Sequence, residues 1–151
     1  MKKYIITTVI AILVLLLFLG CRGAEKTAEE FLMAMHEADA KKMVSLMCDE
    51  LIESANADSK KVLIKQLEDS LENSMEKIRD EYGEKVTCNV EIIDVYKYTP
   101  SLNSTFEGEE MLEAAYSITY KGKGLFKKDE GQTDGELQLV KRGHKWFVAD
   151  F

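Results

Sequence analysis

The chain has 151 residues, 46% of them hydrophobic, and its 27 acidic and 20 basic residues give a formal net charge of −7 at pH 7. A chain of this length suits one domain with a single hydrophobic core. The acidic balance argues against a nucleic-acid partner, because phosphate binding needs a basic face.

The first twenty residues have the composition of a signal peptide. Lys2 and Lys3 precede an uncharged, mostly apolar run from Tyr4 to Gly20, which is the order that a secretory signal requires. Positive flanks stay on the cytoplasmic side of a membrane, so we expect the remaining chain to face outward. Because roughly 17 to 25 apolar residues can also span a bilayer, an uncleaved membrane anchor and simple secretion after cleavage stay open as alternatives.

The end of this run resembles the lipobox of bacterial lipoprotein precursors. The match is Leu19-Gly20-Cys21, and both Phe18 and Leu19 depart from the residues that this pattern usually holds. The resemblance implies that Cys21 becomes the first residue of a mature lipoprotein and carries fatty acyl chains such as palmitate. We therefore expect a signal peptide over residues 1–20, a lipidated tether over 21–27 and a folded domain over 28–151, anchored outside the cell membrane.

Three helices are expected after the tether. Apolar residues recur at helical spacing over residues 28–38, which predicts the first helix. Asp39 is a suitable N-cap for a second helix over residues 43–51. The same spacing over residues 63–82 predicts a third, long helix, and Gly83 stands where a helix usually ends.

Strands are expected after Gly83, because the apolar period changes to two. The alternation over residues 86–95 slips at Ile93, which predicts a strand with a bulge, and Pro100 ends it. Three more strands are expected over residues 112–120, 136–140 and 145–151, with a polar loop over 127–134 before the third. Helices first and strands afterwards predict an α+β domain, with the helices packed on one face of an antiparallel sheet.

Two segments carry a resemblance to a known fold group. The first helix, Ala28 to Met35 with Asp39 at its end, and the ending from Leu139 to Val148 resemble small exported proteins of the nuclear-transport-factor-2-like, or cystatin-like, cone fold. With the leader, the chain is similar to bacterial lipoproteins of unknown function that carry this domain. The resemblance implies a strongly curved antiparallel sheet around a long helix, with a pocket in its hollow.

No function follows from this resemblance, because the fold serves isomerases, dehydratases, cyclases, transport factors and binding modules alike. No residue matches a catalytic motif of the group, so we assign no catalytic residue and no cofactor. His36 is expected to be partly exposed on a helix surface, although a base in the cone is conceivable. His144 is expected in a solvated turn.

An acidic loop and two cysteines were considered as sites. The loop holds Asp129, Glu130, Asp134 and Glu136, but their spacing does not fit a calcium-binding EF-hand, so we expect no metal site. In an oxidising compartment Cys48 and Cys88 could form a disulfide worth roughly 4 kcal/mol. Both cysteines also occupy apolar positions, so two buried free thiols are an equal alternative.

The expected function is therefore coarse. We expect a membrane-anchored, non-enzymatic binding or accessory module outside the cytoplasm, whose partner is a small apolar ligand in the cone or another envelope protein. An enzyme of isomerase, dehydratase or cyclase type that uses the cone is the alternative. A homodimer formed through the outer face of the sheet is a third expectation.

Overall fold

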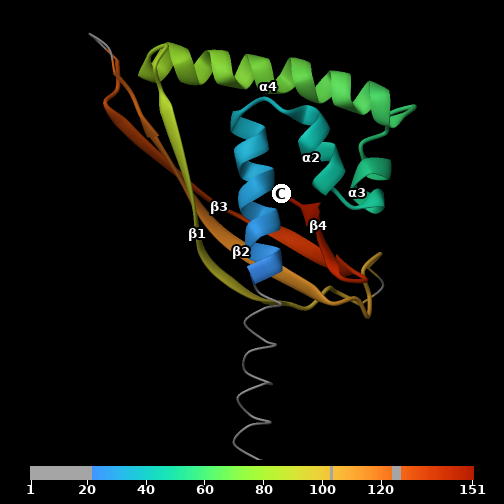
Figure 1. Cartoon of the computed structure of the whole chain (residues 1–151). Coiled ribbons are helices and arrows are strands. Elements are labelled where there is room, and N and C mark those ends of the chain that lie inside the picture. Colours follow the sequence, from blue (N-terminus) through green and yellow to red (C-terminus); the bar gives the residue numbers. More distant parts are fainter. Residues whose placement is uncertain (1–21, 103, 124–126) are drawn as a thin grey trace, which may run out of the picture.

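The computed structural model describes residues 22–102, 104–123 and 127–151. The leader and Cys21 lie outside the described residues. The described chain is an α+β domain, as expected: helices come first, and a four-stranded antiparallel sheet follows. The sheet curves around the helices, which all lie on its inner side (Figure 1).

The first described helix covers residues 22–36. The tether expected over residues 21–27 is therefore wrong for residues 22–27, which continue the helix. Ala24 is fully buried, and Gly23 lies against the Trp146 ring, since a Cβ on it would be 3.2 Å from Cδ1. The physical reason is that these small residues let the helix approach strand β4 (Lys145–Asp150), so the packed body starts within three residues of Cys21.

Two short helices, α2 (Ala40–Leu46) and α3 (Asp49–Ser54), replace the single helix expected after Asp39. Asp39 is the N-cap as expected, because its Oδ1 accepts a hydrogen bond of 3.0 Å from the Lys42 N–H. The helix is interrupted where the Cys48 N–H donates to the Val148 carbonyl oxygen of β4, at 2.8 Å. That donor is no longer available to an α-helix.

The long helix α4 (Lys60–Tyr82) confirms the third expected helix. The Ser59 side chain caps it by accepting from the Val62 N–H at 3.3 Å. It ends at Gly83, which has a φ of +97°, a conformation that glycine adopts without steric cost. None of these helices is long and apolar enough to cross a bilayer, within the residues that the structure describes.

The sheet is a simple meander in the order β1-β2-β3-β4. Its strands are β1 (Thr87–Tyr98), β2 (Met111–Lys121), β3 (Glu130–Arg142) and β4 (Lys145–Asp150). The register shifts between Ile92 and Asp94, which confirms the expected bulge at Ile93. The polar loop expected over residues 127–134 is wrong from Glu130 onward, because those residues pair with β2 in one unbroken register.

Alternation divides the sheet into two faces. On β2, the even-numbered residues from Leu112 to Tyr120 belong to the core under the helices, and this is the inner face. The odd-numbered residues, from Met111 to Lys121, lie on the outer face. At one end of the outer face a second cluster, here called the outer apolar cluster, contains Met111, Val140, Ala149 and Cys48.

Candidate functional site

The hollow of the sheet is filled by aromatic side chains. The hydroxyl of Tyr82 lies over Gly131 and that of Tyr116 lies over Gly135, so a Cβ at either glycine would collide with a ring. Tyr82 also stacks on Tyr120, with ring centroids 5.5 Å apart. Glycine is required at both positions because a phenol occupies the space of a side chain. The inner face is therefore packed where the resemblance implied a pocket.

His36 is part of this packing. Its ring meets Tyr120 edge-on at 5.4 Å between centroids, and the Tyr120 hydroxyl lies 3.4 Å from Nε2. Burial lowers the pKa of His36 from its ordinary value, and burial also raises the pKa of Tyr120 to about 12. The histidine is partly exposed on its helix, as expected, and its buried side packs against a phenol.

Cys48 and Cys88 are both free thiols. Cys88 pairs with Tyr120 at one end of the sheet, whereas Cys48 lies beside β4, near the Leu112 end. Eight residues of β2 separate these ends, or about 26 Å at roughly 3.3 Å per residue. A disulfide needs Cα atoms within about 7 Å, so this fold does not permit the pairing. Burial raises the pKa of both thiols.

The acidic residues around Gly131 are spread along a strand instead of a loop. Asp134 and Glu136 are both on the outer face of β3, two residues apart, and the Asp134 carboxylate accepts from Gln132 Nε2 at 2.9 Å. Within the described residues no group of three or more side chains is placed to hold a metal ion.

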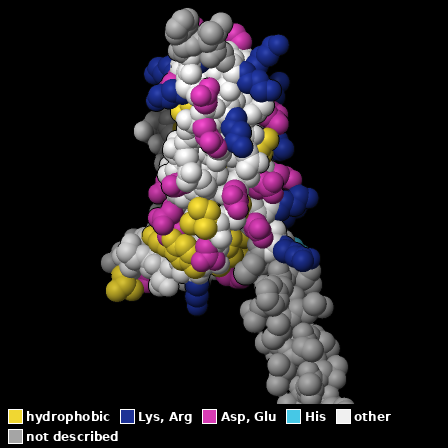
Figure 2. All heavy atoms as spheres, turned by 90° about the vertical axis from the view of Figure 1, so that its left-hand side faces the viewer, with side chains coloured by type: hydrophobic (Ala, Val, Ile, Leu, Met, Phe, Trp, Pro, Cys, Tyr) yellow, Lys and Arg dark blue, Asp and Glu magenta, His cyan; other side chains and the backbone are white. Residues whose placement is uncertain are grey.

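The most distinctive surface is the outer face of the sheet. The register places carboxylates on it in three successive cross-strand rows: Glu113 with Asp150, then Asp94 with Glu136, then Glu91 with Asp134. We call these six residues the acidic face. Figure 2, which views the molecule from the side of β1, shows acidic side chains spread over this side and hydrophobic ones gathered near one end.

Tyr96 organises the middle of the acidic face. Its hydroxyl lies 2.5 Å from Glu113 Oε1 and 2.9 Å from Glu136 Oε1, so the two carboxylates share one phenol. These hydrogen bonds, to Glu113 and then to Glu136, raise the pKa of Tyr96. Gln138 adds a further donor to Glu113, at 3.4 Å. The carboxylates are thus held in fixed positions by neutral donors.

Basic side chains are missing from these rows. No lysine or arginine of the described segments forms an ion pair with any of the six carboxylates. Asp134 is exposed, and hydrogen bonds from Gln132 and then Ser117 lower its pKa, so it stays charged near neutrality. The acidic face therefore presents a fixed, uncompensated negative charge to solvent.

Basic side chains flank the acidic face at its two ends. At the end away from the outer apolar cluster, Lys121 lies 4.0 Å from Glu130, and at the apolar end lies Arg142. Arg142 forms ion pairs of 2.5 Å with Glu50 of α3 and with Glu109 before β2. It thereby joins three segments around the outer apolar cluster, beside a hollow of about 260 Å³ lined by Cys48 and Phe147. We regard this arrangement as a structural clamp, because its charges are satisfied within the chain.

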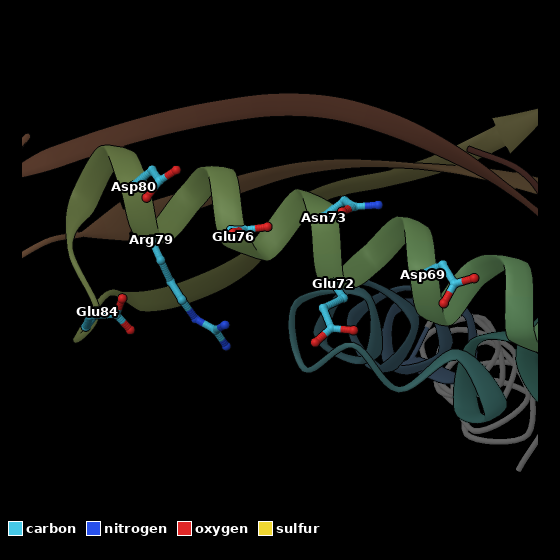
Figure 3. Close-up of a pocket in the computed structure, with 7 residues that line it drawn as sticks. All are labelled: Asp69, Glu72, Asn73, Glu76, Arg79, Asp80 and Glu84. Carbon is cyan, nitrogen blue, oxygen red and sulfur yellow. The ribbon is translucent and has the colours of Figure 1, made fainter.

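A hollow of about 680 Å³ lies along α4. Its lining residues are Asp69, Glu72, Asn73, Glu76, Arg79, Asp80 and Glu84. Figure 3 shows that these side chains project from successive turns of α4 and from the residue shortly after it. A surface formed by one helix flank has no opposing wall to enclose a ligand, so we do not assign a site to it.

The acidic face was missed by sequence reasoning. Only Asp134 and Glu136 were singled out, and they were considered as loop ligands. The other four carboxylates are separated by up to 59 residues of chain from Glu91 to Asp150, and only the strand register brings them together. The alternation of Glu113 and Glu91 with apolar neighbours was the available signal that both point away from the core.

Comparisons with known proteins give limited similarity. No protein-family model matches the chain. No curated protein matches it either. One similar solved structure is a Campylobacter jejuni protein described provisionally as an NTF2-like transpeptidase, with 14% sequence identity and a TM-score of 0.47. The alignment covers 83% of this chain and 95% of that chain.

Proposed function

We propose that the protein is an outward-facing lipoprotein, anchored through Cys21, that works as a non-enzymatic binding module for a positively charged envelope protein. The observation that carries this proposal is the acidic face: six carboxylates in three adjacent rows, with no basic side chain of the described segments paired to them. The apolar residues at its end would add contact area.

Repulsion between the carboxylates of the acidic face favours binding of a cationic partner. Like charges on neighbouring strands destabilise a sheet by a few tenths of a kcal/mol or more per pair. Glu113 and Glu136 are near enough to share the Tyr96 hydroxyl, so their repulsion is only partly relieved by that donor. A cationic partner would remove the remaining repulsion, and it would also be attracted from a distance at low ionic strength.

The other expected partners fit less well. A small apolar ligand would need space in the hollow of the sheet, which Tyr82, Tyr116 and Tyr120 fill. The same packing removes the room that an enzyme would need beside His36. A homodimer through the outer face would oppose two acidic faces, which costs free energy because like charges meet.

The test is binding of octalysine to the full chain in an uncharged detergent. The triple variant Glu113→Gln, Asp134→Asn and Glu136→Gln should weaken binding about tenfold, since each exposed ion pair contributes about 0.2–1 kcal/mol. The matched control, Asp69→Asn, Glu72→Gln and Glu76→Gln, removes the same charge from α4 and should change affinity less than about twofold. If both triple variants weaken binding equally, the peptide senses net charge alone and the proposed face is wrong.

A further inference from the structure

We infer that the part of β3 that extends beyond β4, residues 130–136, is a strand-pairing site that takes an extended basic segment of the partner as a fifth strand. The inference rests on the proposed function and names the form of the partner and the place where it binds. It depends on three observations: an open strand edge, the direction of its backbone groups and the charge beside it.

The edge is open because β4 is much shorter than β3. β4 (Lys145–Asp150) pairs with β3 only from Gln138 to Arg142, while β3 continues to Glu130 and pairs with β2 from Glu130 to Val140. Residues 130–136 thus have a neighbouring strand on one side only. Gln132, Thr133 and Asp134 are all exposed, although their side chains alternate between the two faces.

The backbone groups at this edge point away from β2. At one end of β3, the Lys141 N–H donates to the Glu110 carbonyl oxygen at 3.0 Å, and at the other, the Asp129 carbonyl oxygen accepts from the Gly122 N–H at 2.8 Å. Both odd-numbered residues therefore bond toward β2. Successive residues alternate in an antiparallel ladder, and this register is unbroken. The even-numbered residues then present their N–H and C=O groups to the open side.

The same even-numbered residues are Glu130, Gln132, Asp134 and Glu136, and their side chains lie on the outer face. A strand added at this edge would place its own outward side chains about 4.5–5.5 Å away, measured between Cβ atoms. Lysine or arginine at every second position of that strand would meet Asp134 and Glu136, which form no ion pair within the described residues, and then Glu130, which lies 4.0 Å from Lys121. Backbone hydrogen bonds would give affinity and the side chains would give specificity, as in other cases of strand addition.

A small hollow marks the start of this edge. Its volume is about 180 Å³, and it is lined by Glu113, Glu136, Gln138, Asp150 and Phe151, with Leu137 at its base. The hollow lies where β4 ends. If the partner's strand continues the line of β4 along β3, its first residue lies beside this hollow. A hollow of this size suits one basic side chain, because it is smaller than the pockets that hold drug-sized ligands.

A second copy of this chain is a poor occupant. Within the described residues its open edges include β1 and this part of β3, and both carry carboxylates on the outer face: Glu91 and Asp94 on β1, Asp134 and Glu136 on β3. Pairing of either edge with β3 would set like charges opposite one another. The bulge at Ile93 further disturbs β1 as a pairing edge. The charge of the edge therefore selects a basic segment from another protein.

The first experiment separates strand pairing from charge attraction. A peptide of alternating lysine and threonine is compared, on the full chain in uncharged detergent, with two N-methylated forms, one methylated on the lysine amides and one on the threonine amides. All three carry the same charge. Only one set of amides can face β3, so we expect one methylated peptide to bind at least about tenfold more weakly and the other to bind normally.

The second experiment changes the protein without changing its charge. Gln132→Pro removes an N–H that points to the open edge and leaves the ladder to β2 complete, and Gln132→Ala is the matched control that keeps this donor. We expect the proline variant to weaken binding of the unmethylated peptide about two- to tenfold and the alanine variant to leave it unchanged. Thermal unfolding of both variants checks that the fold is retained.

The outcomes distinguish this inference from the proposed function. If both methylated peptides bind as well as the parent, and the acidic-face triple variant still weakens them, strand pairing is wrong and the acidic face stands. If no peptide responds to the triple variant, the proposed function fails with it. Equal losses of affinity for the two methylated peptides would also overturn the inference, because only one set of the peptide's amides can face β3.

Discussion

His36 lies at the border between the surface of the first helix and the packed hollow of the sheet. The residue is partly exposed on its helix, as expected, and the other side of its ring packs on Tyr120, where burial lowers its pKa. The helix spacing placed it next to the apolar stripe, and it could not show how far a tyrosine of β2 reaches over the helix. Contacts between distant elements decide the burial of residues at the border of a stripe.

This burial predicts a pH dependence of stability. Because the folded state holds His36 with a pKa below its ordinary value of 6.5, the unfolded chain takes up this proton first as the pH falls. The His36 contribution is therefore complete above about pH 6.5 and is lost progressively below it. We expect His36→Gln to lose less free energy of unfolding between about pH 7.5 and pH 5.5 than the parent chain does.

Urea unfolding followed by Trp146 fluorescence measures this difference, since Trp146 is the only tryptophan. His144→Gln is the control, because His144 is exposed in the turn between β3 and β4. Its pH dependence should match that of the parent chain. Parallel curves for His36→Gln and the parent would show that burial of His36 does not couple to its protonation.

The two cysteines show that sequence spacing does not reveal whether two residues lie close together in the fold. Their count and compartment permitted a disulfide, and their apolar positions permitted two buried thiols. The strand register decides between them, because Cys88 lies opposite Tyr120 while Cys48 bonds to Val148 near the other end of the sheet. Sequence spacing alone carries no information on this separation.

Among the helices and strands, the apolar periodicity of the sequence predicted those elements that bury one face. The helix over residues 63–82 was predicted from its continuous apolar stripe, and the bulge at Ile93 was predicted from a slip in the apolar alternation. β3 was predicted only from residue 136, where Leu137 and Leu139 are buried. Its first part alternates glycine and threonine with acidic residues and Gln132, and it has little burial to reveal a strand. Residues 130–136, which the sequence pattern did not predict as a strand, are the part of β3 that we infer to bind a partner.

The charges in the first turn of α4 oppose the helix dipole. Its first turn contains Lys60 and Lys61 and no acidic residue, although the N-terminus of a helix favours negative charge. We expect Lys61→Glu to raise the free energy of unfolding by about 0.5–1 kcal/mol, since it also creates an i,i+4 pair with Lys65. Urea unfolding measures the change.

Lys77→Glu is the matched control for this prediction, because it makes the same change in net charge near the other end of α4. It should lower the free energy of unfolding by a few tenths of a kcal/mol, since it places another negative charge near the C-terminus and faces Glu81 one turn on. If both substitutions shift stability in the same direction, the effect comes from net charge and not from the helix dipole.

At the scale of the whole molecule, the class of the fold could be predicted from the sequence, whereas the acidic face could not. Helix and strand periodicities are local, so their order along the chain was enough to predict an α+β domain. The acidic face assembles Glu91, Asp134 and Asp150 from three strands. Only the register and the curvature of the sheet create it. The filled hollow likewise depends on where Tyr82 and Tyr116 meet two glycines.

The start of the domain bears on how it would sit on a membrane. Residues 22–36 are helical, and Ala24 is fully buried. A lipid on Cys21 would therefore hold the packed body directly, without the polar tether expected from the sequence. The partner segment would then have to reach the acidic face close to the lipid surface, which favours another membrane-attached protein.

Lipidation of Cys21 is itself a prediction. The protein is isolated from its native membrane and cleaved after acidic residues, and the first such site is Glu25, because no acidic residue precedes it. We expect a peptide over residues 21–25 whose mass includes fatty acyl chains on Cys21. Cys21→Ser should abolish this peptide, whereas Cys48→Ser, which changes a thiol inside the domain, should leave it intact. Recovery of residues 1–25 as one peptide, with Lys2 and Lys3 still attached, would contradict the lipoprotein and show an uncleaved anchor in its place.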